Sequence, residues 1–274
     1  MKKIIYAFAG VLALAFGLSS CSMFKYDVLD GPNAQINGRL LDVKTGEKIG
    51  VETYTTSSGS AGIMTVIEQG WDAEAEQGWM VRFDGMYTNN LIFAGDYVFS
   101  TKRLPCYEPS NNSFTVKPGK NRMDISLLPF CRILNPQIRY DASSKKVIAT
   151  FSVEVTDPAK ANQVTNVALC GNTQLFVGCN SQNMIASDSK KNPNARMKNV
   201  NPGETITLEI DSTQPENAEL FRYKQDRYFR IAAMASGNGY NANNYYNFSP
   251  IYKLSADFST IEEVVWDESE WENP

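Results

Sequence analysis

The sequence predicts an all-β protein built from two antiparallel β-sandwich domains. Three observations support this fold class. Short stretches of alternating apolar and polar residues recur along the chain, and in a strand this alternation turns one face toward a core. Turn-forming Gly, Pro, Asn and Asp residues separate the stretches. No long stretch shows the 3.6-residue period of an amphipathic helix, so helices are not expected to build the core.

The amino terminus is expected to be a signal peptide and a tether. Two lysines precede an apolar run over residues 4–18, which is shorter than the ~20 residues of a membrane-spanning helix. The run ends in Leu-Ser-Ser before Cys21, a pattern typical of a lipoprotein signal peptidase site. We therefore expect residues 1–20 to be removed, Cys21 to carry palmitate and other acyl chains, and residues 21–33 to form the tether. The alternative is an ordinary secretory signal followed by a chance cysteine.

The predicted N-terminal domain covers residues 34–131. Residues 34–42 alternate as a strand, and a Lys-Thr-Gly-Glu turn follows them. Residues 68–79 contain Glu-Gln-Gly-Trp twice, which we interpret as a loop or hairpin joining two strand ends. The clearest β pattern covers residues 79–100. Its Asp-Gly dipeptide at 84–85 predicts a tight turn, because both residue types tolerate positive φ.

The predicted C-terminal domain covers residues 132–274. A segment bounded by prolines, residues 129–136, is interpreted as the junction, because proline favours an extended chain and blocks a helix. Strand-like segments such as 147–155 and 228–234 then recur at spacings of about 8–15 residues. The chain closes in an acidic tail over residues 262–274.

Composition excludes several kinds of protein. The chain contains no histidine, which excludes Ser-His-Asp and Cys-His catalysis, histidine-ligated zinc and a histidine general base. The formal net charge of -4 argues against nucleic acid and against docking on anionic lipid. We expect a protein that is not an enzyme and that needs no cofactor and no metal.

Four cysteines follow the predicted lipidation site. Their spacing includes no Cys-x-x-Cys, which argues against a zinc or redox motif. An oxidising envelope permits disulfides, and three pairings are possible. The simplest pairing is Cys106–Cys131 and Cys170–Cys179. Free buried thiols are the alternative, because cysteine also packs as a small apolar residue.

Several motifs of the first domain resemble a known fold. The strand over residues 36–42, the Thr-Gly-Glu turn at 45–47, and the segments 83–87 and 94–98 resemble the carboxypeptidase regulatory-like, or transthyretin-like, domain. In that fold the pattern is a Gly-x-apolar-x-Asp strand, a Thr-Gly-Glu turn and two later strands with Asp-Gly and Gly-x-Tyr. The resemblance implies a transthyretin-like β-sandwich.

The whole mature chain resembles a two-domain family of unknown function among Bacteroidetes lipoproteins. The segments that carry this resemblance are 68–71, 84–85, 128–133 and 228–231. It implies a transthyretin-like first domain and an immunoglobulin-like second domain, commonly encoded beside SusC/SusD-like glycan importers. These motifs specify folds and carry no functional residues to transfer.

The resemblance implies a non-catalytic outer-membrane lipoprotein that assists polysaccharide capture or uptake with a SusC/SusD-like importer. Its expected ligand is a polysaccharide or oligosaccharide. The alternative is a structural or adhesion module that contacts protein only. We expect the lipid anchor to hold the chain at the cell surface rather than at the periplasmic face. Residues 22–27 depart from the acidic run that usually follows the lipidated cysteine of exported lipoproteins in this phylum.

Glycan binding needs aromatic platforms for sugar faces and nearby polar groups for hydroxyls. The candidates are aromatic and asparagine residues of two predicted loops: Trp71, Trp79, Tyr240, Asn243, Asn244, Tyr245 and Tyr246. Each group has a structural alternative. The tyrosines would fold back onto the sandwich, and one or both tryptophans would pack in a core. Trp266 and Trp271, in the acidic tail, are more typical of a loosely packed chain end.

A carboxylate-based glycosidase is a third hypothesis. Asp72, Glu74 and Glu76 alternate with alanines, so in a strand they would share one face. Paired carboxylates about 5–9 Å apart can cleave glycosidic bonds. The pattern is more typical of a solvated acidic loop.

Overall fold

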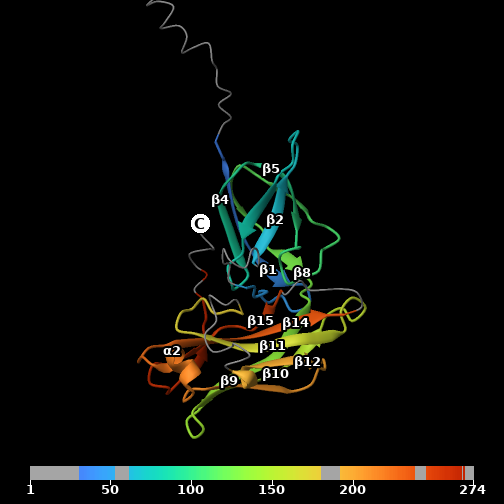
Figure 1. Ribbon diagram of the computed structural model, residues 1–274. Helices are drawn as coiled ribbons and strands as arrows, with labels where there is room; N and C mark the ends of the chain where they lie inside the picture. Colours follow the sequence, from blue (N-terminus) through green and yellow to red (C-terminus); the bar gives the residue numbers. More distant parts are fainter. Residues whose placement is uncertain (1–30, 53–61, 180–191, 238–244, 267, 269–274) are drawn as a thin grey trace, which may run out of the picture.

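The computed structural model describes residues 31–52, 62–179, 192–237, 245–266 and 268. These residues form four β-sheets, in which antiparallel pairs predominate, and little helix. The sheets form two sandwiches, and Figure 1 shows the N-terminal sandwich standing on the face of the C-terminal one. The all-β sandwich prediction is confirmed.

The N-terminal sandwich packs two sheets face to face. One has the order β4-β1-β7 with β8 also pairing with β1, and the other has the order β3-β2-β5-β6. Strand β1 runs antiparallel to β4 and parallel to β7 and β8. The strands are β1 (Ala34–Asp42), β2 (Ile63–Glu68), β3 (Glu76–Met80), β4 (Met86–Ile92), β5 (Gly95–Ser100), β6 (Ser113–Val116), β7 (Gly119–Arg122) and β8 (Ile125–Leu127).

Strand β1 occupies the centre of its sheet and passes from the outer end of the sandwich to the C-terminal sandwich (Figure 1). Gly38 lies at its midpoint because nothing larger fits there. A β-carbon at this position would lie 1.7 Å from the carbonyl oxygen of Met123. The hydroxyl of Tyr87 donates a 2.6 Å hydrogen bond to the same oxygen, which holds the two sides of the strand together.

The predicted turn at 84–85 is present and positions Asp84. Gly85 has φ +87°, and its N–H donates a 2.8 Å hydrogen bond to the carbonyl of Arg82. The turn connects β3 to β4 and points toward the C-terminal sandwich. Asp84 is thereby placed at the boundary between the two sandwiches.

The C-terminal sandwich also has two sheets, with the orders β13-β10-β9 and β12-β11-β14-β16-β17, and β15 pairs with β14. Its core lies between them and includes Phe151, Leu208 and Phe229. The elements are β9 (Cys131–Asp141), β10 (Lys146–Val155), β11 (Gln163–Asn172), η1 (Pro193–Ala195), β12 (Arg196–Val200), β13 (Ile206–Asp211), η2 (Pro215–Asn217), α2 (Ala218–Phe221), β14 (Arg227–Ser236), β15 (Asn247–Phe248), β16 (Tyr252–Leu254) and β17 (Ile261–Glu263).

The proline-bounded segment is part of strand β9 rather than a free connection. Pairing with β10 begins at Cys131 and continues to Asp141, with a register shift near Asn135, whose φ is +50°. Pro136 is tolerated because β9 is an edge strand, where a missing N–H does not interrupt a ladder. The domain boundary between residues 131 and 132 stays a prediction.

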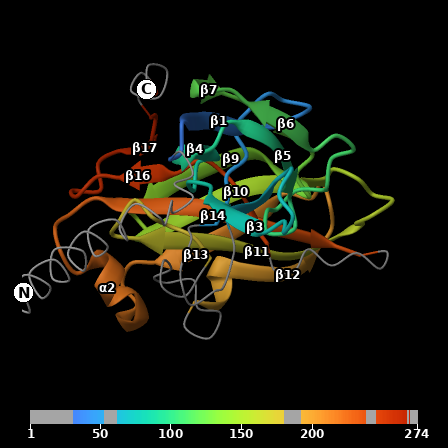
Figure 2. The ribbon, with the colours of Figure 1, turned by 90° about the horizontal axis from the view of Figure 1, so that it is seen from above.

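The two sandwiches contact each other through an apolar cluster on the outer face of β11 and β14. Phe83 of the N-terminal sandwich packs there against a group of small and apolar residues: Ala168, Cys170, Val177, Ala232 and Ile251. Viewed from above, the N-terminal strands lie over this sheet (Figure 2). The contact is therefore a buried interface.

Candidate functional site

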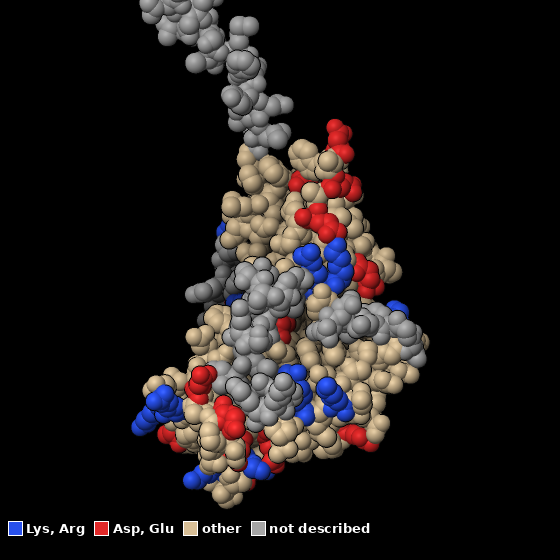
Figure 3. Space-filling model, viewed as in Figure 1, with Lys and Arg blue, Asp and Glu red and all other residues tan. Residues whose placement is uncertain are grey.

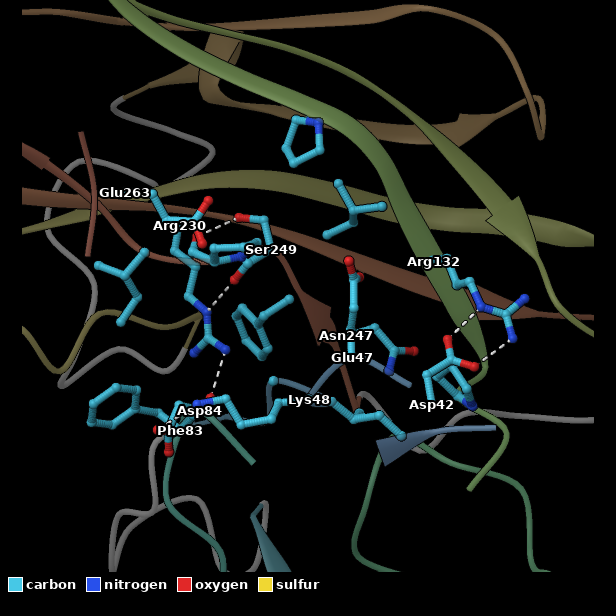
Figure 4. A pocket seen from close by; sticks show the side chains of 18 of the residues that line it. Asp42, Glu47, Lys48, Phe83, Asp84, Arg132, Arg230, Asn247, Ser249 and Glu263 are labelled. Carbon is cyan, nitrogen blue, oxygen red and sulfur yellow. Dashed lines mark hydrogen bonds and ion pairs between the residues drawn. The ribbon is translucent and has the colours of Figure 1, made fainter. Parts of the chain in front are cut away.

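A cleft of about 710 Å³ lies between the two sandwiches (Figure 4). The N-terminal sandwich supplies one wall, from the turn after β1 and the turn that contains Asp84. The C-terminal sandwich supplies the other wall, from β9, β15, β16 and the segment that follows β17. The cleft therefore exists only when both sandwiches are folded and docked.

Arg230 joins the two walls at the base of the cleft. It projects from β14 and is 1% exposed. Its guanidinium donates hydrogen bonds to three carbonyl oxygens: to Val51 at 3.0 Å, to Phe83 at 2.7 Å and to Ser249 at 3.1 Å. Burial lowers the pKa of Arg230 to about 10, so the side chain stays charged at neutral pH. One side chain thus binds the backbone of both sandwiches.

A buried ion pair closes one end of the cleft. Asp42 ends β1, and Arg132 lies at the start of β9. Arg132 donates from Nη2 to Asp42 Oδ1 at 2.8 Å and from Nε to Oδ2, and its Nη1 reaches Glu154 at 3.2 Å. Burial raises the pKa of Asp42, but the hydrogen bonds and charge of Arg132, together with backbone hydrogen bonds from Lys44 and Thr45, hold the pKa below its ordinary value.

A second charged group lies at the other end of the cleft. Arg82 donates from Nε to Asp84 Oδ1 at 2.7 Å, and Lys48 Nζ lies 3.6 Å from Asp84 Oδ2. Lys48 also pairs with Glu268 of the tail. Burial raises the pKa of Asp84, but the hydrogen bond from Arg82 and the charge of Lys48 hold it below its ordinary value. The tail is thereby bound to the N-terminal sandwich.

Aromatic side chains line the cleft between these charged groups. Trp266 packs with its ring centroid 5.4 Å from that of Phe83 and 5.1 Å from the guanidinium carbon of Arg82. Phe248 lies under Arg230, whose guanidinium carbon is 4.1 Å from the ring centroid. Aromatic surface beside a few fixed polar groups is typical of a small-molecule or glycan site.

The N-terminal sandwich matches a known sequence family. Residues 34–127 match the model described as "Protein of unknown function (DUF3823) N-terminal domain". Over these residues the chain is therefore similar to the DUF3823 N-terminal domain. The match covers β1 to β8, so the matched residues supply the Asp42 and Asp84 wall of the cleft. No curated protein matches the chain.

Several solved structures share the fold of both sandwiches. A protein from Bacteroides uniformis ATCC 8492 that is proposed to bind carbohydrate is 25% identical, with a TM-score of 0.66 over 85% of this chain and 100% of its own. A DUF3823 family protein from Parabacteroides merdae ATCC 43184 is 19% identical, with a TM-score of 0.63 over 82% and 100%. Another from Bacteroides ovatus ATCC 8483 is 22% identical, with a TM-score of 0.58 over 81% and 99%.

The two predicted tryptophan platforms have different positions in the N-terminal sandwich. Trp79 is 3% exposed, and its ring packs 5.9 Å from Tyr97 and 6.0 Å from Phe114. The platform interpretation is wrong for Trp79, because its place in β3 turns it into the core. Trp71 is 47% exposed, on the connection between β2 and β3, with its edge 6.5 Å from Phe93. Its role in binding stays a prediction.

The predicted tyrosine and asparagine loop is described only at its end. Tyr245 and Tyr246 are partly buried, the first against the core of the C-terminal sandwich and the second against the apolar cluster at the interface. Burial raises the pKa of Tyr246 well above its ordinary value. Tyr240, Asn243 and Asn244 lie outside the described residues, as do Trp271 and the predicted lipidation site Cys21.

The four later cysteines are free thiols in the structure. Cys170 and Cys179 lie side by side, with their sulfur atoms 3.1 Å apart, so the predicted partners are adjacent although no bond joins them. Cys131 is not joined to Cys106, and its thiol instead donates to the carbonyl of Ala233 at 3.5 Å. Cys106 and Cys131 are both buried, and the pairing of the four cysteines stays a prediction.

The carboxylates considered for glycosidic chemistry do not reach the cleft. Asp72, Glu74 and Glu76 are all exposed, and Glu76 pairs with Lys102. Acidic side chains gather at this far end of the N-terminal sandwich in Figure 3. Within the described ranges, no three His, Cys, Asp or Glu side chains are placed to hold a metal ion. The described part of the chain also contains no helix long and apolar enough to cross a membrane.

Sequence reasoning alone missed the residues that build the cleft. The signal available for Arg230 is a lone arginine inside an otherwise apolar strand, since a buried charge requires partners. The signal for Trp266 is weaker, because an aromatic residue in an acidic tail is also typical of a loose chain end. Lys48 gives no signal, because a lysine after a turn is ordinary.

Proposed function

We propose that this protein is a non-catalytic outer-membrane lipoprotein that binds glycan in the cleft between its two sandwiches. In this proposal Cys21 carries the lipid anchor, and the protein assists a SusC/SusD-like importer at the cell surface. The first domain is transthyretin-like and the second immunoglobulin-like. The observation that carries the proposal is the cleft itself, whose wall combines aromatic rings with fixed polar groups.

The chemistry of the cleft suits a sugar. The weakly polar face of a pyranose packs on aromatic rings, which Trp266, Phe248 and Tyr252 offer along the C-terminal wall. Sugar hydroxyls need hydrogen-bond acceptors, and exposed carboxylates on both walls supply them. The likeness to the Bacteroides uniformis protein proposed to bind carbohydrate supports the same ligand class.

The position of the cleft suits capture outside the membrane. Strand β1 begins at the end of the N-terminal sandwich that lies away from the C-terminal one, and it ends at Asp42 in the cleft (Figure 1). Nine residues of strand extend about 30 Å. An anchor at Cys21 would therefore attach at the outer end of β1 and hold the cleft away from the bilayer.

Isothermal titration against a polysaccharide panel tests the proposal. We expect at least one panel member to bind, and Trp266→Ala to weaken that binding about two- to twelvefold, since loss of a stacked aromatic contact costs about 0.5–1.5 kcal/mol. Trp71→Ala is the matched control, because Trp71 lies outside the cleft. If Trp71→Ala lost binding and Trp266→Ala kept it, the binding site would lie outside the cleft, at the far end of the N-terminal sandwich. Silence across the panel would refute glycan binding.

A protein-only adhesion module is the second candidate. It is favoured by exposed apolar residues on the N-terminal sandwich, including Leu91 at 77% and Met80 at 60%. Such surface can bind a protein partner. Pull-down of importer subunits by the wild-type chain without glycan, and its loss in Leu91→Asp, would support this candidate. Metabolic palmitate labelling of the wild type and of Cys21→Ser tests the anchor, and protease treatment of intact cells tests surface exposure.

A further inference from the structure

We propose that the cleft selects uncharged glycans and discriminates against those that carry uronate or sulfate groups. This inference rests on the proposed function and names the ligand class of the same site. The inference follows from which charged side chains a ligand can reach. The cations that line the cleft are bound by other groups of the protein, whereas carboxylates on both walls remain accessible. Acidic polysaccharides need an available cation in the binding site, and neutral ones need hydrogen-bond partners and apolar surface.

The cations that line the described part of the cleft are already engaged. Arg132 is bound by Asp42 on one edge and by Glu154 on another. Lys48 lies between two carboxylates, those of Asp84 and Glu268. A ligand carboxylate would have to displace one of these protein carboxylates, which would leave a buried or half-buried acid without its partner.

Arg230 does not offer its charge to a ligand either. All three of its nitrogen atoms donate to backbone carbonyl oxygens at 2.7–3.1 Å, and the side chain is 1% exposed. The ring of Phe248 covers one face of the guanidinium. The positive charge of Arg230 is therefore used to hold the sandwiches together.

The carboxylates that remain accessible lie on opposite walls. Glu47 follows β1 on the N-terminal wall, and Glu263 ends β17 on the C-terminal wall (Figure 4). Both are exposed, and neither forms an ion pair within the described residues. A carboxylate accepts hydrogen bonds from two neighbouring sugar hydroxyls, so this pair suits a neutral sugar. The same pair repels an anionic one.

A matched pair of ligands tests the selectivity. The probes are a neutral polysaccharide that binds in the panel and the same polymer after oxidation of its primary alcohols to carboxylates, titrated into the detergent-solubilised full chain. We expect the oxidised polymer to bind at least tenfold more weakly at low salt, which corresponds to about 1.4 kcal/mol. Raising the salt concentration should narrow the gap, because repulsion between accessible charges is screened.

Variants assign the discrimination to the cleft. Glu47→Gln with Glu263→Gln should raise the affinity for the oxidised polymer relative to the neutral one. Glu74→Gln is the matched control, since it removes an exposed carboxylate outside the cleft, and it should leave the ratio unchanged. Equal or tighter binding of the oxidised polymer, lost in Trp266→Ala, would overturn the selectivity and leave glycan binding intact. Failure of every polymer to bind would overturn both.

Discussion

Replacing Arg230 with methionine tests whether one buried side chain holds the cleft together. Methionine keeps most of the length and the apolar stem, so little packing volume is lost. It removes all three hydrogen bonds, those to the carbonyls of Val51, Phe83 and Ser249. Two of these carbonyls belong to the N-terminal sandwich, so the substitution weakens the interface as well as the C-terminal sandwich.

The magnitude follows from two opposing effects. Leaving a buried carbonyl unpaired costs about 2 kcal/mol, and this applies to Val51 and Ser249. The Phe83 carbonyl still accepts a 3.1 Å hydrogen bond from the N–H of Val51, so its lost hydrogen bond costs about 1 kcal/mol. Removing the buried charge returns part of this cost. Burial lowers the pKa of Arg230 from its ordinary 12.5 to about 10, which corresponds to about 3 kcal/mol of stability spent on burying the charge. We expect Arg230→Met to lower the free energy of unfolding by about 2 kcal/mol.

Urea unfolding followed by circular dichroism measures this loss, and titration with glycan measures the cleft. Arg227→Met is the matched control. Arg227 is equally buried on the same strand, but it donates only to carbonyls within residues 220–225 of the C-terminal sandwich. Both variants should be less stable, and only Arg230→Met should also weaken glycan binding. Stability of Arg230→Met within about 0.5 kcal/mol of the wild type would refute the reasoning.

Three further predictions concern stability and redox state. Because the folded-state pKa of Asp42 lies below its ordinary 3.8, its ion pair stabilises the protein above that pH and is lost as pH falls through the lower folded value. Asp42→Asn should therefore lower the free energy of unfolding by about 2–3 kcal/mol at pH 7. It should also reduce the loss of stability on acidification, measured by urea unfolding between pH 6 and 3. An unchanged loss of stability over this pH range would contradict the prediction. Gly38→Ala should lower the melting temperature by roughly 10 °C or prevent folding, because the new β-carbon would lie 1.7 Å from the carbonyl oxygen of Met123. An unchanged melting transition in calorimetry would exclude this close contact. Under oxidising conditions Cys170 and Cys179 should form a disulfide, because a shift of about 1 Å brings their sulfur atoms into bonding range. Peptide mass spectrometry detects the disulfide, and two free thiols after oxidation would refute the prediction.

Local patterns predicted the local structure well. The strand predicted over residues 34–42 has the same bounds as β1, and the Asp-Gly turn at 84–85 has the expected positive φ. Both depend on short-range properties, the alternation of side chains and the backbone freedom of glycine. Trp79 shows the limit of such local prediction, because its sequence neighbours do not indicate whether a tryptophan in this strand turns inward or outward.

The sequence alone determined the all-β class, the bounds of strand β1 and the exclusion of histidine chemistry, because each depends on local residue pattern or composition. The tertiary structure decided the candidate site. Arg230 meets Val51 across 179 residues, and Arg132 meets Asp42 across 90. Such contacts form only when two independently patterned sandwiches dock. The two walls of the cleft come from different sandwiches, and no sequence motif links them. The cleft is therefore a property of the docked fold.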